Sequence, residues 1–122
     1  MYKNTENGYE LIRCSSGKNT INIKQGTTII SKYAFDSCDK LKKVVIPESV
    51  VLVKKRAFSG CYKLSDVTFL SDSVEIEDDA FDSDYELNEL KFPSSTRKLK
   101  WCINNQWELV YDYILLNDYF VT

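Results

Sequence analysis

The sequence contains no histidine among its 122 residues. Without an imidazole, neither a Ser-His-Asp nor a Cys-His nucleophile can be assembled, and every zinc site that uses histidine is excluded. The four cysteines include no CxxC pair, so a zinc ribbon is not expected either. No stretch approaches the roughly 18 consecutive apolar residues that a membrane-spanning helix needs. We therefore expect no metal, no cofactor and no insertion into a membrane.

A large excess of one charge is also missing, because the formal net charge is only −2. This balance gives the chain no general attraction for nucleic acid or for an anionic membrane. The basic run Lys54–Arg56 is short and lacks the interleaved aromatic residues of a nucleic-acid platform. The first residues are polar and show no apolar stretch of a secretory signal. The prediction is a cytoplasmic protein that binds no nucleic acid, or a surface or secreted one if a signal has been removed.

The sequence does contain an internal repeat. The segment Ala34–Pro47 (AFDSCDKLKKVVIP) recurs as Ala57–Leu70 and as Ala80–Pro93, at a step of 23 residues. The three copies share columns of apolar residues at this spacing. These columns are Phe35, Phe58 and Phe81; Ala34, Ala57 and Ala80; Leu41, Leu64 and Leu87; Val44, Val67 and Leu90; Ile46, Phe69 and Phe92; and Ile30, Val53 and Ile76. A unit of this size cannot bury its own apolar face, so we expect the copies to stack into a solenoid.

Each copy contains a short alternating segment that is typical of a strand. In the first copy Val44 and Ile46 are expected to face inward, and Lys43 and Val45 to face outward. The predicted strands are residues 42–46, 65–69 and 88–92, preceded by a strand that contains Ile21 and Ile23. Because the apolar columns would fill the interior, we expect no catalytic pocket and no enzyme activity.

We expect a single domain over residues 1–122. Its parts are a partial repeat at 1–26, regular repeats at 27–93, and a degenerate repeat with a C-terminal cap at 94–122. Residues 1–10 are expected to lack regular structure. The 23-residue step can be continued into the fourth repeat. It predicts that the columns of Ile76, Leu87, Leu90 and Phe92 continue, in that order, at Leu99, Val110, Tyr113 and Leu115. Asn104 would stand in the phenylalanine column, with Trp101 or Trp107 replacing the missing ring, and residues 117–122 would cover the last edge.

The cysteines follow the repeat only in part. Cys38 and Cys61 share one column, whose third member is Asp84. A column that accepts aspartate does not require a disulfide, although two disulfides, including Cys14 and Cys102, are the alternative in an oxidising compartment. We favour free thiols that pack as small apolar side chains.

The pattern A-F-x-x-C-x-x-L-x-x-V-x-I-P, with an apolar pair before it, resembles the BspA-type leucine-rich repeat family. The resemblance is close over residues 27–93 and looser over 11–26 and 94–116. It implies a right-handed, β-rich or α+β solenoid, with short parallel strands on a concave face and irregular loops or helical turns opposite. It also implies a surface or secreted protein of bacteria or parasitic protists that serves adhesion or protein binding, without shared catalytic residues.

The outward strand positions are candidate binding residues, because solenoids commonly present such a face to a partner. They form two predicted ladders. One contains Thr20, Lys43, Asp66, Glu89 and Asp112, and the other contains Asn22, Val45, Thr68, Lys91 and Ile114. The alternative is a solvated sheet face with ion pairs such as Lys43–Asp66, each contributing about 0–1 kcal/mol.

Two further features allow a functional and a structural interpretation. The aromatic C-terminal region, with Trp101, Trp107 and Tyr119, is either a sealing cap or a contact surface for a homo-oligomer. Residues 32–63 carry eight basic and three acidic side chains, whereas residues 72–89 carry nine acidic and none basic. Either the opposite charges of neighbouring repeats neutralise each other, or the uneven charge distribution steers a charged partner.

We predict a protein-binding module without catalysis. The alternatives are a structural or self-assembling subunit that uses the solenoid ends, and a fragment of a cell-surface adhesin.

Overall fold

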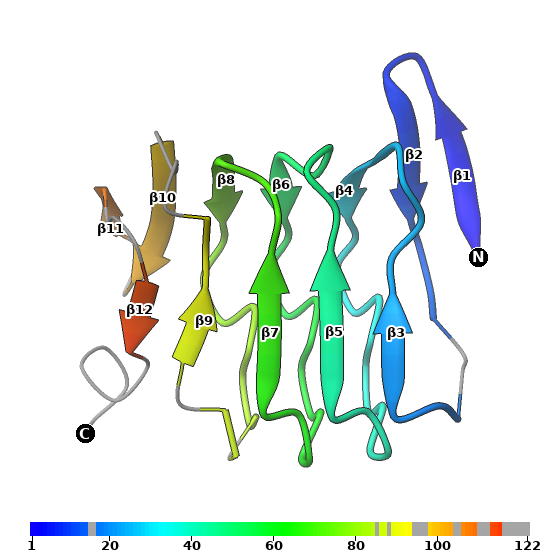
Figure 1. The fold of residues 1–122 in the computed structure, drawn as a ribbon, viewed down its shortest axis with the longest axis vertical. Helices are drawn as coiled ribbons and strands as arrows, with labels where there is room; N and C mark the ends of the chain where they lie inside the picture. Colours follow the sequence, from blue (N-terminus) through cyan, green and yellow to red (C-terminus); the bar gives the residue numbers. More distant parts are fainter. Residues whose placement is uncertain are drawn as a thin grey trace.

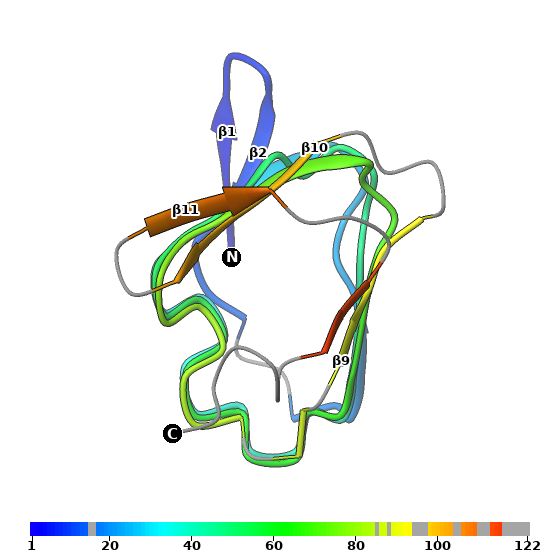
Figure 2. The ribbon, with the colours of Figure 1, turned by 90° about the vertical axis from the view of Figure 1, so that its left-hand side faces the viewer.

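The computed structural model describes residues 1–14, 17–84, 86–87, 89–93, 98–103, 106–109 and 113–115. It is a β-solenoid in which a five-stranded sheet faces a seven-stranded sheet, and the described residues contain no helix. Figure 1 shows the five-stranded sheet in front of the strands of the other sheet. Viewed along the axis, the successive coils superimpose closely (Figure 2). The predicted solenoid is confirmed.

The five-stranded sheet contains the predicted strands at nearly the predicted positions. It has the order β12-β9-β7-β5-β3. Its members are β3 (Thr20–Asn22), β5 (Lys43–Ile46), β7 (Asp66–Phe69), β9 (Glu89–Lys91) and β12 (Tyr113–Leu115). β3, β5, β7 and β9 are parallel and keep the 23-residue register, with Val44 opposite Ile21 and Val67 opposite Val44.

The segment opposite forms a second sheet rather than the irregular loops or helical turns implied by the resemblance. Its order is β1-β2-β4-β6-β8-β10-β11. Its members are β1 (Tyr2–Thr5), β2 (Gly8–Leu11), β4 (Thr27–Ile30), β6 (Leu52–Val53), β8 (Ser73–Ile76), β10 (Lys98–Ile103) and β11 (Gln106–Leu109). β-Branched residues such as those of β4 (TTII) favour a pleated strand, and Ile30 pairs in register with Val53, which pairs with Ile76.

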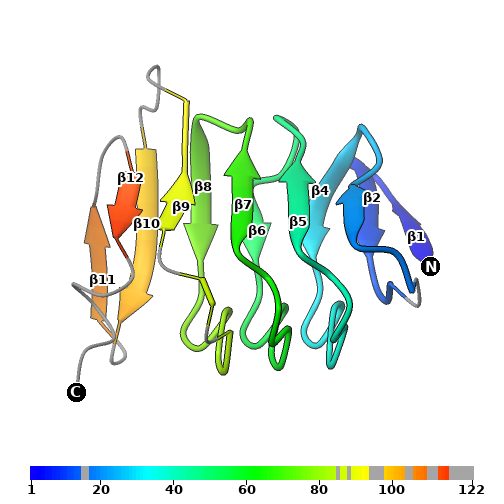
Figure 3. The ribbon, with the colours of Figure 1, turned by 60° about the horizontal axis from the view of Figure 1, so that its bottom comes forward.

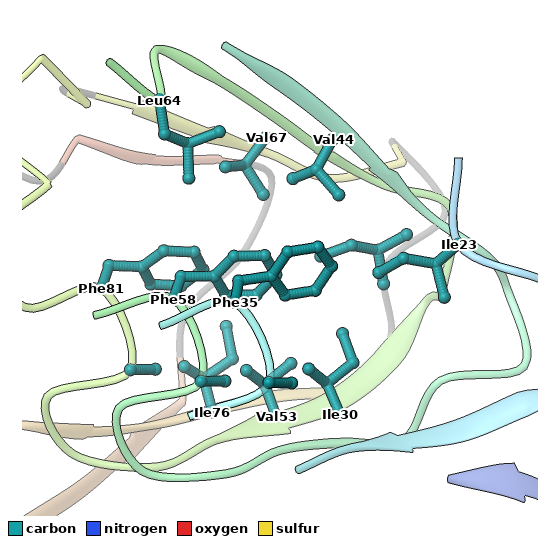
Figure 4. Close-up of a cluster of buried hydrophobic side chains, with 14 of the residues drawn as sticks. Ile23, Ile30, Phe35, Val44, Val53, Phe58, Leu64, Val67, Ile76 and Phe81 are labelled. Atoms are coloured by element: carbon teal, nitrogen blue, oxygen red, sulfur yellow. The ribbon is translucent and has the colours of Figure 1, made fainter. Parts of the chain in front are cut away.

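A ladder of phenylalanines fills the space between the two sheets (Figure 4). The rings of Phe35 and Phe58 stack with centroids 4.5 Å apart, and those of Phe58 and Phe81 with centroids 5.0 Å apart. Val44 and Val67 pack against one side of the ladder, and the predicted column that contains Val53 packs against the other. The predicted core columns are confirmed, because their residues are buried apart from Phe92, which is partly buried.

The first, second and third coils are the repeats that carry Phe35, Phe58 and Phe81, and each turns its corner through two residues in the left-handed backbone region. The first position is occupied by Tyr33, Arg56 and Asp79, and the second by Ser37, Gly60 and Ser83, with φ between 56° and 75°. Two residues after the first position, the core phenylalanines of the first two coils donate their backbone N–H to the alanine carbonyl of the next coil, Phe35 to Ala57 at 2.7 Å and Phe58 to Ala80 at 2.8 Å. The corner is therefore a specific turn that is copied along the stack.

The N-terminal end is regular, so the prediction of an unstructured segment over residues 1–10 is wrong. β1 and β2 form an antiparallel hairpin that extends the seven-stranded sheet at one end, as Figure 3 shows. Gly8, with φ of 139°, passes so close to Gly26 that a Cβ would collide with the Gly26 carbonyl oxygen. The hairpin is thus fixed against the first coil by backbone contact.

The C-terminal end corrects the predicted register of the fourth repeat. Trp101 of β10 lies opposite Ile76, where Leu99 was predicted, so this copy is offset by two residues. β12 runs antiparallel to β9 and places Tyr113 opposite Lys91 and Leu115 opposite Glu89, so the predicted parallel positions of Tyr113, Ile114 and Leu115 are wrong. An antiparallel strand reverses the chain direction and ends the parallel stack. The predictions for Asn104, Val110 and residues 117–122 lie outside the described residues.

Candidate functional site

The outward face of the five-stranded sheet carries the candidate binding residues in two in-register rows. Lys43 lies between Thr20 and Asp66 in the sheet register. Val45 lies beside Thr68, which lies beside Lys91. The outward side chains are exposed or half-buried, whereas the alternate residues Val44, Ile46, Val67, Phe69 and Leu90 are buried. The predicted alternation, and with it the arrangement of the two rows, is confirmed over β3, β5 and β7 and for Lys91 of β9.

The electrostatics of this face centre on Asp66. Its Oδ1 accepts a hydrogen bond from the Thr68 hydroxyl at 3.1 Å and lies 3.9 Å from the Lys91 ammonium. The ion pair expected between Lys43 and Asp66 is absent from the described contacts of these two residues, although they are neighbours in the register. Lys43 thus remains an exposed cation beside a carboxylate that is already held by two other groups.

The remaining candidates lie toward the C-terminal end. Glu89 occupies the first position of β9, and its backbone pairs with β12. Trp101 lies on β10 and Trp107 on β11, where Trp107 is opposite Cys102 in an antiparallel pair. Asp112 and Tyr119 lie outside the described residues. The structure therefore brings Lys43, Val45, Asp66, Thr68 and Lys91 together on one face and places the two tryptophans on the other sheet.

An aromatic group at the N-terminal end was missed by the sequence analysis. The Lys24 ammonium lies 3.8 Å from the centroid of the Tyr9 ring and 5.7 Å from that of Tyr2. The Tyr2 hydroxyl accepts a hydrogen bond from the Lys24 backbone N–H at 3.1 Å. The dipeptide Asn7-Gly8 is a hairpin signal, and the chain reverses next to it, with Glu6 and Asn7 as the turn between Thr5 and Gly8. The three side chains fasten the hairpin to the first coil.

The charge split of the sequence is partly neutralised at the corners. The Arg56 guanidinium lies 3.9 Å from a carboxylate oxygen of Asp79, the residue at the equivalent position of the next coil. It lies 3.8 Å from a carboxylate oxygen of Asp82. The backbone N–H of Lys55 donates to Glu77 at 3.0 Å. These contacts join the basic second coil to the acidic third coil, as the self-neutralising interpretation predicts.

The cysteine column combines free thiols with a buried carboxyl group. Cys14, Cys38 and Cys61 are free, and Cys61 is fully buried. Asp84, which is 7% exposed, accepts the backbone N–H of Cys61 on Oδ1 at 2.8 Å, while its Oδ2 has no partner among the described residues. Burial, with a smaller contribution from Asp82, raises the pKa of Asp84 to about 9 although the Cys61 N–H opposes the shift. Asp84 is therefore neutral near pH 7.

Parallel strands that repeat every coil around a filled apolar core define a leucine-rich repeat solenoid. The chain belongs to the family described as the BspA type leucine rich repeat region, whose model matches residues 10–110 in six copies. Repeats of this family and fold are generally not catalytic, and they typically serve binding or structural roles.

Three solved structures share the fold. A leucine-rich repeat protein of T. pallidum has a TM-score of 0.72 and 26% identity, over 81% of this chain and 50% of that protein. A leucine rich cell surface protein of Faecalibacterium prausnitzii has a TM-score of 0.61 and 29% identity, over 78% and 32%. A leucine-rich repeat protein of Bacteroides ovatus shares the fold alone, with a TM-score of 0.67 and 24% identity over 81% of this chain and 29% of that protein. This chain therefore spans half or less of each relative.

No functionally curated protein matches the chain. Among the described residues, no helical segment has the length and apolar character that crossing a membrane requires.

Proposed function

We propose that this chain is a protein-binding module whose partner docks on the outward face of β3, β5, β7 and β9. The observation that carries the proposal is the contrast between the two sides of this sheet. The inward columns repeat one chemistry, whereas the outward positions change from lysine to aspartate and from valine to threonine to lysine along the rows. Changing outward residues on a repeated core is how solenoids vary the surface they present to a partner.

The composition of this face favours protein as the partner. Val45 is half-buried and lies between Asn22 and Thr68 in the register, with the charged Lys43 and Asp66 in the adjacent row. A small apolar centre surrounded by polar and charged side chains of both signs resembles the centre and rim of a protein interface. Nucleic acid would favour a continuous basic surface instead.

The test is capture of proteins from the native source on the immobilised full chain, with three matched baits. The wild type and Lys63→Glu are expected to retain the same partner, because Lys63 is exposed and lies outside the strands of the sheet. Lys43→Glu combined with Val45→Glu should weaken retention at least about tenfold, since it alters the centre of the face. Circular dichroism and unfolding midpoints confirm that all three baits are folded.

Equal retention of the partner by the double variant would reject this face as the binding site. Sedimentation of the wild type at several concentrations addresses the alternative function. A mass that rises with concentration and is unchanged in the double variant would indicate self-assembly through another surface.

A further inference from the structure

The corner cysteines of the first two coils lie directly against each other. Cys38 and Cys61 occupy equivalent positions one coil apart, and their thiol groups lie close enough to perturb each other's ionisation. The carbonyl oxygen of Phe35 accepts both the Cys38 backbone N–H and the Cys61 thiol, each at 3.2 Å. One carbonyl therefore holds both residues at the same corner.

The backbone at this corner has the separation that a disulfide needs. The two coils are joined by hydrogen bonds from Phe35 N to Ala57 O at 2.7 Å and from Ser37 N to Ser59 O at 3.0 Å. Chains joined in this way lie about 4.8 Å apart, within the Cα separation of about 4.4–6.8 Å that disulfides span. Gly60, the residue before Cys61, carries no side chain at this contact.

The two thiols differ in their access to solvent. Cys38 is half-buried and borders an open depression of about 290 Å³ that Arg13 and Lys40 also line. Cys61 is fully buried. The neighbouring Cys61 thiol, assisted by the Arg13 guanidinium, lowers the pKa of Cys38, although burial, Asp36 and Asp39 oppose the shift. The neighbouring Cys38 thiol and burial raise the pKa of Cys61. Cys38 is therefore the thiol that reacts first with a reagent from solvent.

We propose that Cys38 and Cys61 form a thiol oxidation site, in which Cys38 reacts with a peroxide from solvent and Cys61 closes a reversible disulfide. The Cys38 thiolate attacks one peroxide oxygen, the O–O bond breaks, and a sulfenic acid and hydroxide are formed. The Cys61 sulfur then attacks the Cys38 sulfur, the S–O bond breaks as the S–S bond forms, and the Cys61 proton leaves with the hydroxyl group as water. A dithiol reductant restores both thiols and is itself oxidised.

The test is peptide mapping of the folded full chain after treatment with hydrogen peroxide, followed by alkylation and trypsin. The four cysteines fall in separate tryptic peptides, which are residues 14–18, 33–40, 57–63 and 101–122. We expect peptides 33–40 and 57–63 to become linked with the loss of two hydrogen atoms, and dithiothreitol to reverse the link. The kinetics should show a sulfenic acid on Cys38 before the link appears.

Two single variants distinguish this pair from general thiol oxidation. Cys14→Ser should keep the full yield of the link, because the contact of Cys14 with Cys38 is a backbone carbonyl at 3.7 Å from Sγ. Cys38→Ser should abolish the link and leave Cys61 unmodified until the chain is unfolded. Both positions are only partly buried, so these variants are expected to fold, and Cys61 itself stays intact.

Either of two results would overturn the proposal. One is over-oxidation of Cys38 without a link to Cys61. The other is a link that joins a different pair of peptides or two molecules.

Discussion

The second and third coils of the solenoid share one backbone but differ at the corner. Arg56 and Asp79 both have left-handed backbones at the start of the corner, with φ of 58° and 57°. The i to i+3 hydrogen bonds that follow, Ser59 N to Arg56 O and Asp82 N to Asp79 O, are both 3.2 Å long. The second coil then places Gly60 and Cys61 where the third coil places Ser83 and Asp84.

The third coil carries the less favourable residues of this pair of corners. Ser83 adopts φ of 65° at a position where the second coil uses glycine at 75°. Asp84 buries a carboxyl group with one oxygen unpartnered among the described residues, where the second coil buries a thiol that bonds the Phe35 carbonyl. The turn thus tolerates different residues, but the residues of the third coil make its corner less stable than that of the second coil. Unfolding should accordingly begin more easily there than in the second coil.

The largest expected effect concerns the phenylalanine ladder that both coils share. Phe58 is fully buried between the rings of Phe35 and Phe81, whereas Phe81 is 6% exposed. Phe58→Ala should lower the free energy of unfolding by about 3–5 kcal/mol, because it removes two stacked contacts and leaves a cavity. Phe81→Ala should cost about 1 kcal/mol less. Urea unfolding followed by circular dichroism measures both.

Val51→Ala is the control for the ladder, since Val51 is 53% exposed and its loss should change stability by less than about 0.5 kcal/mol. A larger loss for Phe81→Ala than for Phe58→Ala would contradict the view that the second coil is the better packed.

The buried carboxyl group should make the third coil sensitive to pH. The pKa of Asp84 is about 9 in the folded chain, above the ordinary value of about 3.9 for an unfolded aspartate. The folded state therefore holds more protons than the unfolded state between these values. The contribution of neutral Asp84 to the free energy of unfolding is therefore complete below about pH 4 and is lost as the pH rises toward 9. Over this range the free energy of unfolding should fall by up to about 1.4 kcal/mol per pH unit.

Asp84→Asn should flatten this dependence. The amide oxygen can still accept the Cys61 N–H, and the side chain no longer ionises. Urea midpoints from pH 5 to pH 8 should fall for the wild type and change less for the variant. Asp72→Asn, at an exposed acidic position, should keep the slope of the wild type. Parallel slopes for the wild type and Asp84→Asn would show that Asp84 does not titrate in this range.

The sequence revealed the structure wherever the copies agree. Phe58 identifies the core and Val67 the inner side of a strand because a 23-residue step repeats them, and stacked coils must repeat their contacts. The outward positions Lys43 and Asp66 follow from the same alternation. The second sheet was not anticipated, because the family resemblance implied irregular loops or helical turns opposite the predicted strands, and β6 has only two residues.

The ends were harder to predict because they break the repeat. β10 is offset by two residues and β12 is antiparallel, so extending the step misplaces Leu99 and Tyr113. The Lys91–Asp66 pair was also missed, since choosing among neighbouring cations requires side-chain geometry that spacing does not supply. At the N-terminus, the Asn7-Gly8 dipeptide overlaps the hairpin turn, which is formed by Glu6 and Asn7, but it lies outside the repeat.

The smallest expected effect concerns the second left-handed position of each corner. A residue with a Cβ pays about 1–2 kcal/mol for this conformation, whereas glycine adopts it freely but loses more entropy on folding. Ser83→Gly should therefore raise the free energy of unfolding by about 0.5–1 kcal/mol, and Gly60→Ser should lower it by about 1 kcal/mol. A Cβ on Gly60 would lie 3.6 Å from Ser37 Oγ, an ordinary contact, so the backbone accounts for the cost.

The exchange of these two residues tests the corner without changing the core. Ser83→Gly and Gly60→Ser in the same chain should nearly cancel, because the two sites are equivalent positions of one turn. Urea midpoints of the two single variants and the double variant measure this balance. If Ser83→Gly left the midpoint unchanged while Gly60→Ser lowered it, the serine of the third coil would be held by contacts that offset its strain, and the third corner would be no weaker than the second.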